Sequence, residues 1–358
     1  IGTVTWVEGN AVFAFGHPML DRGATAYPMA HAEIVTVMPR LNSSFKMGAV
    51  GDPIGAISRD YRAGIVGQLG GSARMVPLTV NLTFPSRVAS YHFEILDAEA
   101  LTPAIAGLAT LNSVQSAMQS SGAATQDVQV TVSFADGRTA TTRSTLAGFS
   151  PPGELAGTVA RVVGLIHGNP FQPVSIAGIA VEVAVREQIH AAFLEAMTVV
   201  TPRLHAGSPA AVEITLRDYR GERTLERMEM ELPRTLDPGS YRIQVCDGER
   251  DDRTEQERVP GSFVPRDLDT LVRLLESEAS PNRLVMRLIG PGANPVVQGR
   301  ELPQLPGSAA SLLKSSRSSA RAAEAKGTVY AVRSVQFDKV ILGCQAVPVT
   351  VAAPEGDQ

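Results

Sequence analysis

The sequence predicts a mostly β protein with some α-helix, and three observations support that prediction. Residues 1–95 contain short runs of β-branched and apolar residues separated by glycine turns, which is typical of a barrel or a sandwich. Residues 98–120 change to a helical period, which indicates a helix between two domains. Beyond residue 123, strand patterns and helix patterns alternate, so this part is predicted to be an α+β region.

The elements of the first region follow from turn signals and strand-like runs. Residues 3–7 and 11–15 flank Glu8-Gly9-Asn10, which is a hairpin signal. Residues 34–38 are mostly β-branched and stop at a proline. Alternate positions of residues 75–84 are apolar, which predicts a strand with one buried face. We therefore assign residues 1–95 to one barrel.

A connecting helix is predicted within residues 96–122. The sequence Ser120-Ser121-Gly122-Ala123 ends it, and we place the domain boundary there, so that residues 123–358 form an extension. Five apolar side chains at helical spacing predict the buried face of this helix: Leu101, Ile105, Leu108, Leu111 and Val114.

The extension begins with a strand, a turn and a helix. Residues 128–134 are strand-like and lead into an Asp136-Gly137 hairpin turn. Pro151-Pro152 opens a helix that ends at Gly168-Asn169-Pro170. The predicted buried face of this helix contains Leu155, Val159, Val162, Val163 and Ile166.

Most of the remaining strands are predicted to form an immunoglobulin-like sandwich over about residues 179–250 and 328–351. Residues 188–199 fit either a strand or a helix. Residues 268–275 have the pattern of a short amphipathic helix, and the Ser/Ala-rich residues 308–326 are expected to be half linker and half helix.

Composition excludes several classes of protein. With 44% hydrophobic and 19% charged residues, the 358-residue chain can build two or three domains with a sizeable core. A net charge of −4 gives no basis for binding nucleic acid or an anionic membrane. The longest apolar stretch, residues 174–185, is interrupted by Glu182 and is shorter than the ~20 residues of a spanning helix, so we expect no membrane span.

Several short motifs in the first region carry a family resemblance. In chain order they are Gly2-Thr3-Val4-Thr5, Ala14-Phe15-Gly16-His17-Pro18, Ser43-Ser44-Phe45-Lys46, Gly51-Asp52-Pro53-Ile54-Gly55-Ala56-Ile57 and Gly64-Ile65-Val66-Gly67. On these motifs, residues 1–68 resemble the SpoIVB-type serine peptidase domain. The rest of the chain is similar in layout to the C-terminal extension of large secreted bacterial relatives.

The resemblance implies a fold, a location and a chemistry. The family pairs a histidine base with the serine of a Ser-Gly-Ser-Pro motif on a two-barrel fold of the chymotrypsin kind, and in the longer relatives that motif precedes the Gly-His-Pro turn. Since this chain begins at Ile1, immediately before the barrel that carries the histidine, we expect an N-terminal segment or a separate polypeptide to carry the motif. The expected fold is a chymotrypsin-like half barrel followed by the α+β extension, and the expected location is the periplasm or the extracellular space.

Two functions from different classes follow from these implications. The first is an extracytoplasmic serine peptidase-like protein that carries the base without the nucleophile and is inactive alone. The alternative is a non-catalytic binding or structural subunit of a cell-envelope or extracellular assembly. Under either hypothesis, other envelope proteins are candidate partners.

His17 is the candidate base, because a neutral imidazole accepts a hydroxyl proton near neutral pH. Pro18 restricts its backbone to an extended geometry. A structural alternative is a turn histidine that is hydrogen-bonded to the backbone. Asp21 is a weak candidate for the group that orients the imidazole, with Asp52 and Asp60 as further possibilities and turn formation as the alternative role of each.

Other chemistry has little support in the sequence. Ser150 and Ser208 each precede a proline, but no glycine separates them from it as in the family motif, so neither is expected to be a nucleophile. His17, Asp21, His31 and Glu33 have ligand chemistry but not the spacing of a metal site, and no cofactor motif is present, so we expect neither metal nor cofactor.

Cys246 and Cys344 both lie within strand-like runs near the C-terminus. The favoured interpretation is two buried, reduced thiols that act as small hydrophobic side chains. The alternative is one disulfide that pins the last strand, which would form only outside the cytoplasm.

Overall fold

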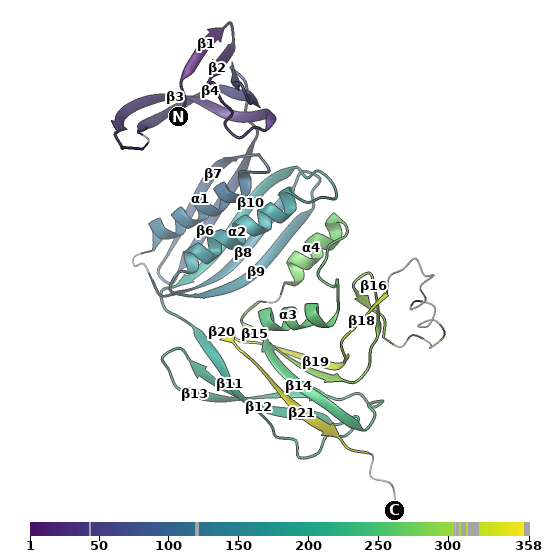
Figure 1. The fold of residues 1–358 in the computed structure, drawn as a ribbon. Coiled ribbons are helices and arrows are strands. Elements are labelled where there is room, and N and C mark those ends of the chain that lie inside the picture. Colours follow the sequence, from purple (N-terminus) through teal and green to yellow (C-terminus); the bar gives the residue numbers. More distant parts are fainter. Residues whose placement is uncertain are drawn as a thin grey trace, which may run out of the picture. The chain divides into compact units, whose positions relative to one another are not determined.

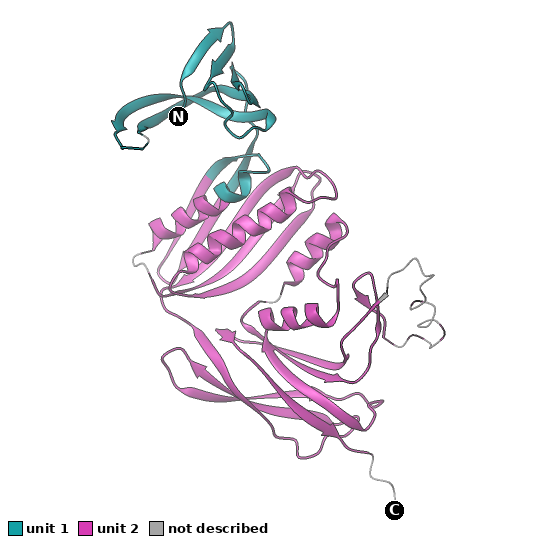
Figure 2. Ribbon diagram, in the orientation of Figure 1, with its two compact units in different colours: residues 1–78, 93–105 teal, residues 79–92, 106–358 magenta. Residues whose placement is uncertain are grey.

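The computed structural model describes residues 1–42, 44–118, 122–278, 280–303 and 322–353, together with the single residues 305, 308 and 313. Within them the chain is mostly β, with four helices, which confirms the predicted fold class at this level (Figure 1). Two compact units are present (Figure 2). Unit 1 contains residues 1–78 and 93–105, and unit 2 contains residues 79–92 and 106–358.

The first sheet is a curled, open half-barrel of five antiparallel strands in the order β1-β2-β5-β4-β3 (Figure 1). Its small buried cluster contains Tyr27, Ile57, Ile65 and Leu96. The strands are β1 (Val4–Glu8), β2 (Ala11–Ala14), β3 (Gly23–Met38), β4 (Phe45–Tyr61) and β5 (Gly64–Leu69).

β3 and β4 are much longer than the other strands of this sheet. Their pairing continues to Met38 and Phe45, whereas β4 pairs with β5 only between Gly55 and Tyr61. Residues 30–38 and 45–53 therefore form a two-stranded ribbon, which no other strand of the described residues flanks, and we call this ribbon the arm.

The second sheet has the strand order β7-β6-β10-β8-β9, and α1 and α2 lie side by side on one of its faces (Figure 1). Its strands are β6 (Met75–Phe84), β7 (Arg87–Leu96), β8 (Ala124–Phe134), β9 (Thr139–Gly148) and β10 (Ile176–Arg186). β6 and β7 thus belong to this sheet and not to the first one, where the assignment of residues 1–95 to one barrel had placed them. β10 belongs here too, and not to the sandwich.

The two helices of this layer differ in how well their buried faces were predicted. α2 (Pro151–His167) buries all five side chains of its predicted face. On α1 (Thr102–Ala117), by contrast, Leu108 is 58% exposed. The physical reason is close packing: a Cβ on Gly107 would lie 2.6 Å from the carbonyl oxygen of Ala156 on α2, so small residues and not the leucines make this contact.

Two four-stranded sheets complete the chain and share one hydrophobic core. The sheet β13-β12-β11-β20 contains β11 (Ala191–Val199), β12 (Pro209–Asp218), β13 (Arg223–Glu231) and β20 (Val340–Leu342). The sheet β19-β15-β14-β21 contains β14 (Gly239–Asp247), β15 (Arg283–Gly290), β19 (Thr328–Gln336) and β21 (Cys344–Val351). Residues 188–199, which fitted either a strand or a helix, thus contribute the strand β11.

Smaller elements connect these sheets. α4 (Leu268–Ser277) confirms the predicted amphipathic helix, whereas α3 (Gly248–Arg258) was not predicted. A small sheet contains β16 (Pro295–Val297), β17 (Arg300–Glu301) and β18 (Ala322–Glu324). Most of the Ser/Ala-rich segment 308–326, and the predicted boundary at Ser120-Ser121, lie outside the described residues. In the part of the chain that the structure describes, no helix has the length and apolar character needed to cross a membrane.

Candidate functional site

His17 follows a strained turn at the end of β2. Phe15 has a φ of 75°, and the amide of Gly16 donates to the carbonyl of Ala14 at 3.1 Å. A hydrogen bond across one residue with positive φ defines a γ-turn in its rarer and more strained form. An aromatic residue in this conformation is a backbone outlier of the kind that concentrates at functional sites.

Two glycines, Gly2 and Gly64, pack closely against this turn. A Cβ on Gly2 would overlap the ring of Phe15, and a Cβ on Gly64 would lie 2.9 Å from the carbonyl oxygen of Ala14. The amide of Phe15 also donates to the carbonyl of Thr3 at 3.1 Å. Neighbouring segments therefore impose the turn, and two glycines, Gly2 before β1 and Gly64 at the start of β5, leave the space for it.

The imidazole of His17 is exposed to solvent. Its Nδ1 lies 2.7 Å from the carbonyl oxygen of Pro18, and its ring centroid is 5.5 Å from that of Phe15. Because a carbonyl oxygen only accepts, Nδ1 carries a proton, and in the neutral imidazole Nε2 is then the acceptor. A histidine base that takes a proton on Nε2 needs this tautomer.

The open side of His17 has no protein partner among the described residues. Neither a serine nor a carboxylate forms a hydrogen bond with the imidazole within that part of the chain. The backbone carbonyl of Pro18 occupies the position on Nδ1 that a carboxylate holds in a serine protease triad.

Asp60 anchors the loop that follows His17. Its side chain is fully buried, and its two carboxylate oxygens accept hydrogen bonds from the amides of Met19 and Leu20, both at 2.7 Å. Burial alone would raise the pKa of Asp60, but the amides of Met19, Leu20, Arg22 and Asp21 outweigh it and hold that pKa below its usual value.

The other two candidate carboxylates lie elsewhere. Asp21 has a φ of 55° and accepts a hydrogen bond at 3.3 Å from Nε of Arg62, with both side chains largely exposed. Within the described residues, no hydrogen bond joins Asp21 to His17. Asp52 is an exposed residue of the arm. Of the three carboxylates, the structure ties only Asp60 firmly to the loop of His17.

An apolar cavity of about 610 Å³ lies within the first sheet, next to the strained turn. Phe15 lines it, and so does part of the arm. Its other apolar lining residues include Val4, Val12, Met29, Ile57 and Ile65. A cavity of this size falls in the range of ~300–1,000 Å³ that is usual for binding sites.

The remaining sequence candidates do not form a site in the described part of the chain. No three potential ligands among His, Cys, Asp and Glu gather there, so His17, Asp21, His31 and Glu33 do not form a metal centre. Ser150 precedes α2 as its N-terminal cap residue.

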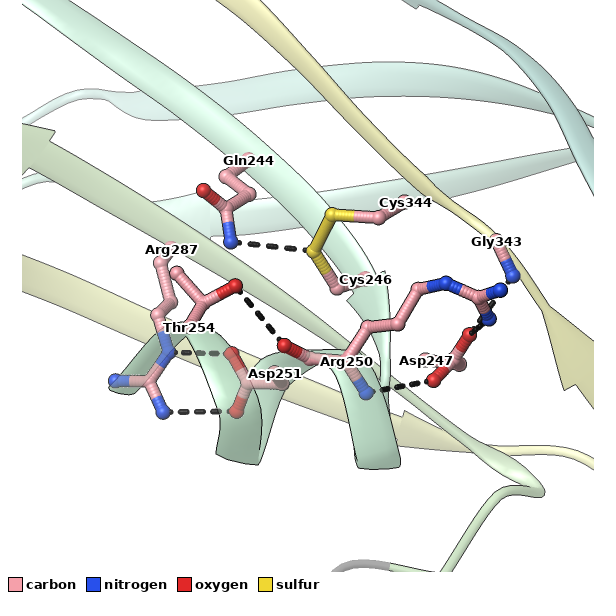
Figure 3. Close-up of a disulfide and its surroundings, with 9 residues drawn as sticks. All are labelled: Gln244, Cys246, Asp247, Arg250, Asp251, Thr254, Arg287, Gly343 and Cys344. Carbon is pink, nitrogen blue, oxygen red and sulfur yellow. Dashed lines mark hydrogen bonds and ion pairs between the residues drawn. A yellow bond between two sulfur atoms is a disulfide. The ribbon is translucent and has the colours of Figure 1, made fainter. Parts of the chain in front are cut away.

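The two cysteines form a disulfide between β14 and β21 (Figure 3). Cys246 and Cys344 are direct register partners, with Cα atoms 4.0 Å apart, so the interpretation as two reduced thiols is wrong. Next to them, Asp247 accepts hydrogen bonds from the amides of Gly343 at 2.8 Å and Arg250 at 2.9 Å. Strand pairing brought together two residues that the sequence separates by 98 positions.

The chain was compared with family models, curated proteins and solved structures. No family model, no curated protein and no solved structure matches the chain.

Sequence patterns identified His17 but not the structural features that hold it in position. The Gly16-His17-Pro18 turn is visible in the sequence, whereas the strained backbone of Phe15 and the anchor Asp60 depend on contacts with distant strands. Asp60 had no local signal that would distinguish it from Asp21 or Asp52.

Proposed function

We propose that this chain is an extracytoplasmic SpoIVB-type serine peptidase-like protein that supplies the histidine base, His17. A segment with a Ser-Gly-Ser-Pro motif, N-terminal or on a separate polypeptide, supplies the nucleophile. The observation that carries the proposal is the strained γ-turn, which presents an exposed imidazole with Nε2 open. Backbone strain of this kind persists only where surrounding structure enforces it, as Gly2 and Gly64 allow here.

The exposed apolar surfaces of the first sheet favour a binding partner that is itself rich in β-strands. Several large apolar side chains are more than half exposed, among them Trp6 at 63%, Val35 at 72% and Val50 at 78%. Val35 and Val50 belong to the arm, and two pairs of adjacent residues in its β3 strand are apolar and exposed: Ile34 with Val35, and Val37 with Met38. Because neighbouring residues of a strand point to opposite faces, both faces of the arm are apolar.

A two-stranded ribbon is marginally stable in water by itself. Since no strand in the described part of the chain flanks the arm, it offers unpaired backbone groups together with apolar faces. Strands of the nucleophile-bearing segment would pair with these backbone groups and cover the apolar faces. They would thereby complete a chymotrypsin-like barrel around the apolar cavity.

The disulfide supports the location in this proposal. Disulfides persist in oxidising compartments such as the periplasm and the extracellular space. The bond between Cys246 and Cys344 is therefore what we expect of an extracytoplasmic protein. The immunoglobulin-like character of the C-terminal sheets remains part of the proposal, supported by their shared core.

The proposal predicts that His17 activates a serine outside this chain. The test compares the chain alone with a version extended by the nucleophile-bearing segment, using a fluorophosphonate probe. We expect no labelling of the chain alone. In the extended protein, His17→Ala should lower peptidase turnover by a factor on the order of a million, as for other catalytic histidines.

The matched control is His92→Ala, because His92 is also exposed but lies on β7 of the second sheet. It should leave turnover unchanged. Equal activity of the His17→Ala and His92→Ala proteins would instead favour the non-catalytic binding or structural subunit, which needs the apolar surfaces but not the open imidazole.

A further inference from the structure

A second cavity, of about 640 Å³, lies in unit 2 and has a different character from the apolar cavity of the first sheet. Its floor is one face of the second sheet, where Asp127 and Gln129 of β8 alternate with the buried Val128 and Val130. Its wall is formed by residues before β15 and after β19, including Asn282 and the adjacent strand ends. We call this cavity the polar cleft.

A hydrogen-bonded ladder crosses the floor of the polar cleft. Arg143, Gln129 and Glu182 are direct register partners on β9, β8 and β10. Nε of Arg143 donates to Oε1 of Gln129 at 2.8 Å, and Nε2 of Gln129 donates to Oε2 of Glu182 at 3.1 Å. The ladder holds three planar polar groups in fixed positions, which lowers the entropy lost when a ligand binds.

A second set of bonds continues the floor. Asp127 accepts from Oγ1 of Thr145 at 2.8 Å and from Nη2 of Arg186 at 2.9 Å. Thus two arginines and two carboxylates, Arg143 and Arg186 with Asp127 and Glu182, occupy one floor. Their formal charges cancel, so the floor offers donors and acceptors at close spacing without a strong field of either sign.

Two atoms of the residues that line the cleft lack a hydrogen-bond partner among the described residues. They are Nε of Arg186, a donor on the floor, and Oδ1 of Asn282, an acceptor on the wall. Buried polar atoms are nearly always paired, with protein or with ordered water. The wall itself is fixed, because the amide of Phe337 donates to the carbonyl of Asn282 at 2.8 Å.

We propose that the polar cleft binds an uncharged oligosaccharide. Each sugar hydroxyl both donates and accepts, and adjacent hydroxyls suit planar groups with two polar atoms, such as the carboxylate of Glu182 and the guanidinium of Arg143. A charged ligand would instead need a large excess of one sign, whereas the charged residues that line the cleft, with Asp338 on its wall included, sum to a net charge of −1. The cavity volume is in the range that is usual for small-ligand sites.

Exposure to solvent alone does not explain this arrangement. One face of an antiparallel sheet is often simply solvated. Here, however, Asn282 and its neighbours close the face from a second direction and leave a cavity. Two cross-strand networks line the floor of this cavity.

Isothermal titration of the intact chain with short cello-, xylo-, manno- and chito-oligosaccharides tests this inference. We expect one of these series to bind with a Kd of roughly 10 μM to 1 mM, as a few hydrogen bonds allow. Gln129→Ala and Glu182→Ala should each weaken binding by about tenfold or more, because each leaves a ladder partner unpaired. Thermal unfolding of each variant separates lost binding from lost folding.

The control is Glu226→Ala, since Glu226 is an exposed glutamate of β13 outside the cleft. This variant and His17→Ala should bind the sugar as the unchanged chain does, which keeps the inference separate from the proposed peptidase chemistry. It would be overturned by failure of all four series to bind, by preference for sulfated or phosphorylated sugars, or by unchanged affinity of both cleft variants.

Discussion

At the level of single residues, the position of His17 depends on a carboxylate that lies far from it in sequence. Asp60 is fully buried at the end of β4 and accepts the amides of Met19 and Leu20. Those amides belong to the loop directly after His17 and Pro18. The ionised carboxylate therefore stabilises both the fold of the first sheet and the geometry of the candidate base.

Replacing this carboxylate should destabilise unit 1 in a pH-dependent way. Asp60→Asn lowers the number of acceptor sites for the two amides, and we expect it to reduce the free energy of unfolding by about 1–3 kcal/mol at neutral pH. The folded-state pKa of Asp60 is depressed, so its stabilisation is present above the unfolded pKa of about 3.9 and is lost as the pH falls through the folded pKa.

Urea unfolding followed from neutral to acidic pH measures this effect. The difference between Asp60→Asn and the unchanged chain should shrink as the pH falls below about 4. Asp21→Asn is the matched control, because its partner Arg62 is exposed, and it should cost less than about 1 kcal/mol. A pH-independent difference for Asp60→Asn would show that the charge of the carboxylate is not what holds the loop.

At the level of elements, α3 shows how a helix forms without an apolar face. Only Gly248, Asp251 and Arg258 of its residues are buried, and charged side chains attach it to its neighbours. Arg287 of β15 donates to both carboxylate oxygens of Asp251, at 2.6 and 2.8 Å. Arg258 donates to Glu255 within the helix at 2.7 Å and to Glu301 of β17 at 2.5 Å.

Breaking this network should destabilise unit 2 strongly. Arg258→Ala removes the buried guanidinium that joins Glu255 to Glu301, and leaves Glu255 with its longer pair to Arg287 at 3.4 Å and Glu301 with its hydrogen bond from Asn294. Because a buried pair is broken from one side, we expect a loss of about 3–5 kcal/mol of unfolding free energy. Arg253→Ala on the same helix removes only an exposed pair with Glu249 at 3.5 Å and should cost less than about 1 kcal/mol. Chemical denaturation of both variants gives the comparison, and equal losses would contradict a structural role for the buried network.

At the level of the whole molecule, a disulfide links two strands that lie far apart in the sequence. Cys246 and Cys344 lie 98 positions apart, on the strands β14 and β21, which pair in register at one edge of their sheet. The loop between them contains α3, α4 and the small sheet of β16–β18. A cross-link of this span removes conformational freedom mainly from the unfolded chain.

Removing the cross-link should therefore lower stability without changing the fold. For the double variant Cys246→Ala with Cys344→Ala, we expect a loss of about 2–5 kcal/mol, near the upper end because the loop is long. Urea unfolding should also show a larger m-value, since the unfolded chain becomes more expanded. If dithiothreitol left the midpoint of the unchanged chain unaltered, the disulfide would not contribute as proposed.

Local sequence determined much of this protein, because helix and strand periods depend on neighbouring residues. The buried face of α2 and the turns at Gly9 and Gly137 follow from patterns within a few positions. His17 was visible for the same reason, in its Gly-His-Pro turn. Most strands were also found, including those that end the chain at β19 and β21.

Tertiary structure decided how those elements combine, because strand pairing and burial join residues that are distant in sequence. Strand pairing places β6, β7 and β10 in one sheet and brings Cys246 next to Cys344. The helix α3 is held by ion pairs instead of an apolar face. Tertiary structure also selected Asp60 from three similar aspartates and imposed the strained backbone before His17. No local pattern encodes these outcomes, since each depends on the register of a partner strand.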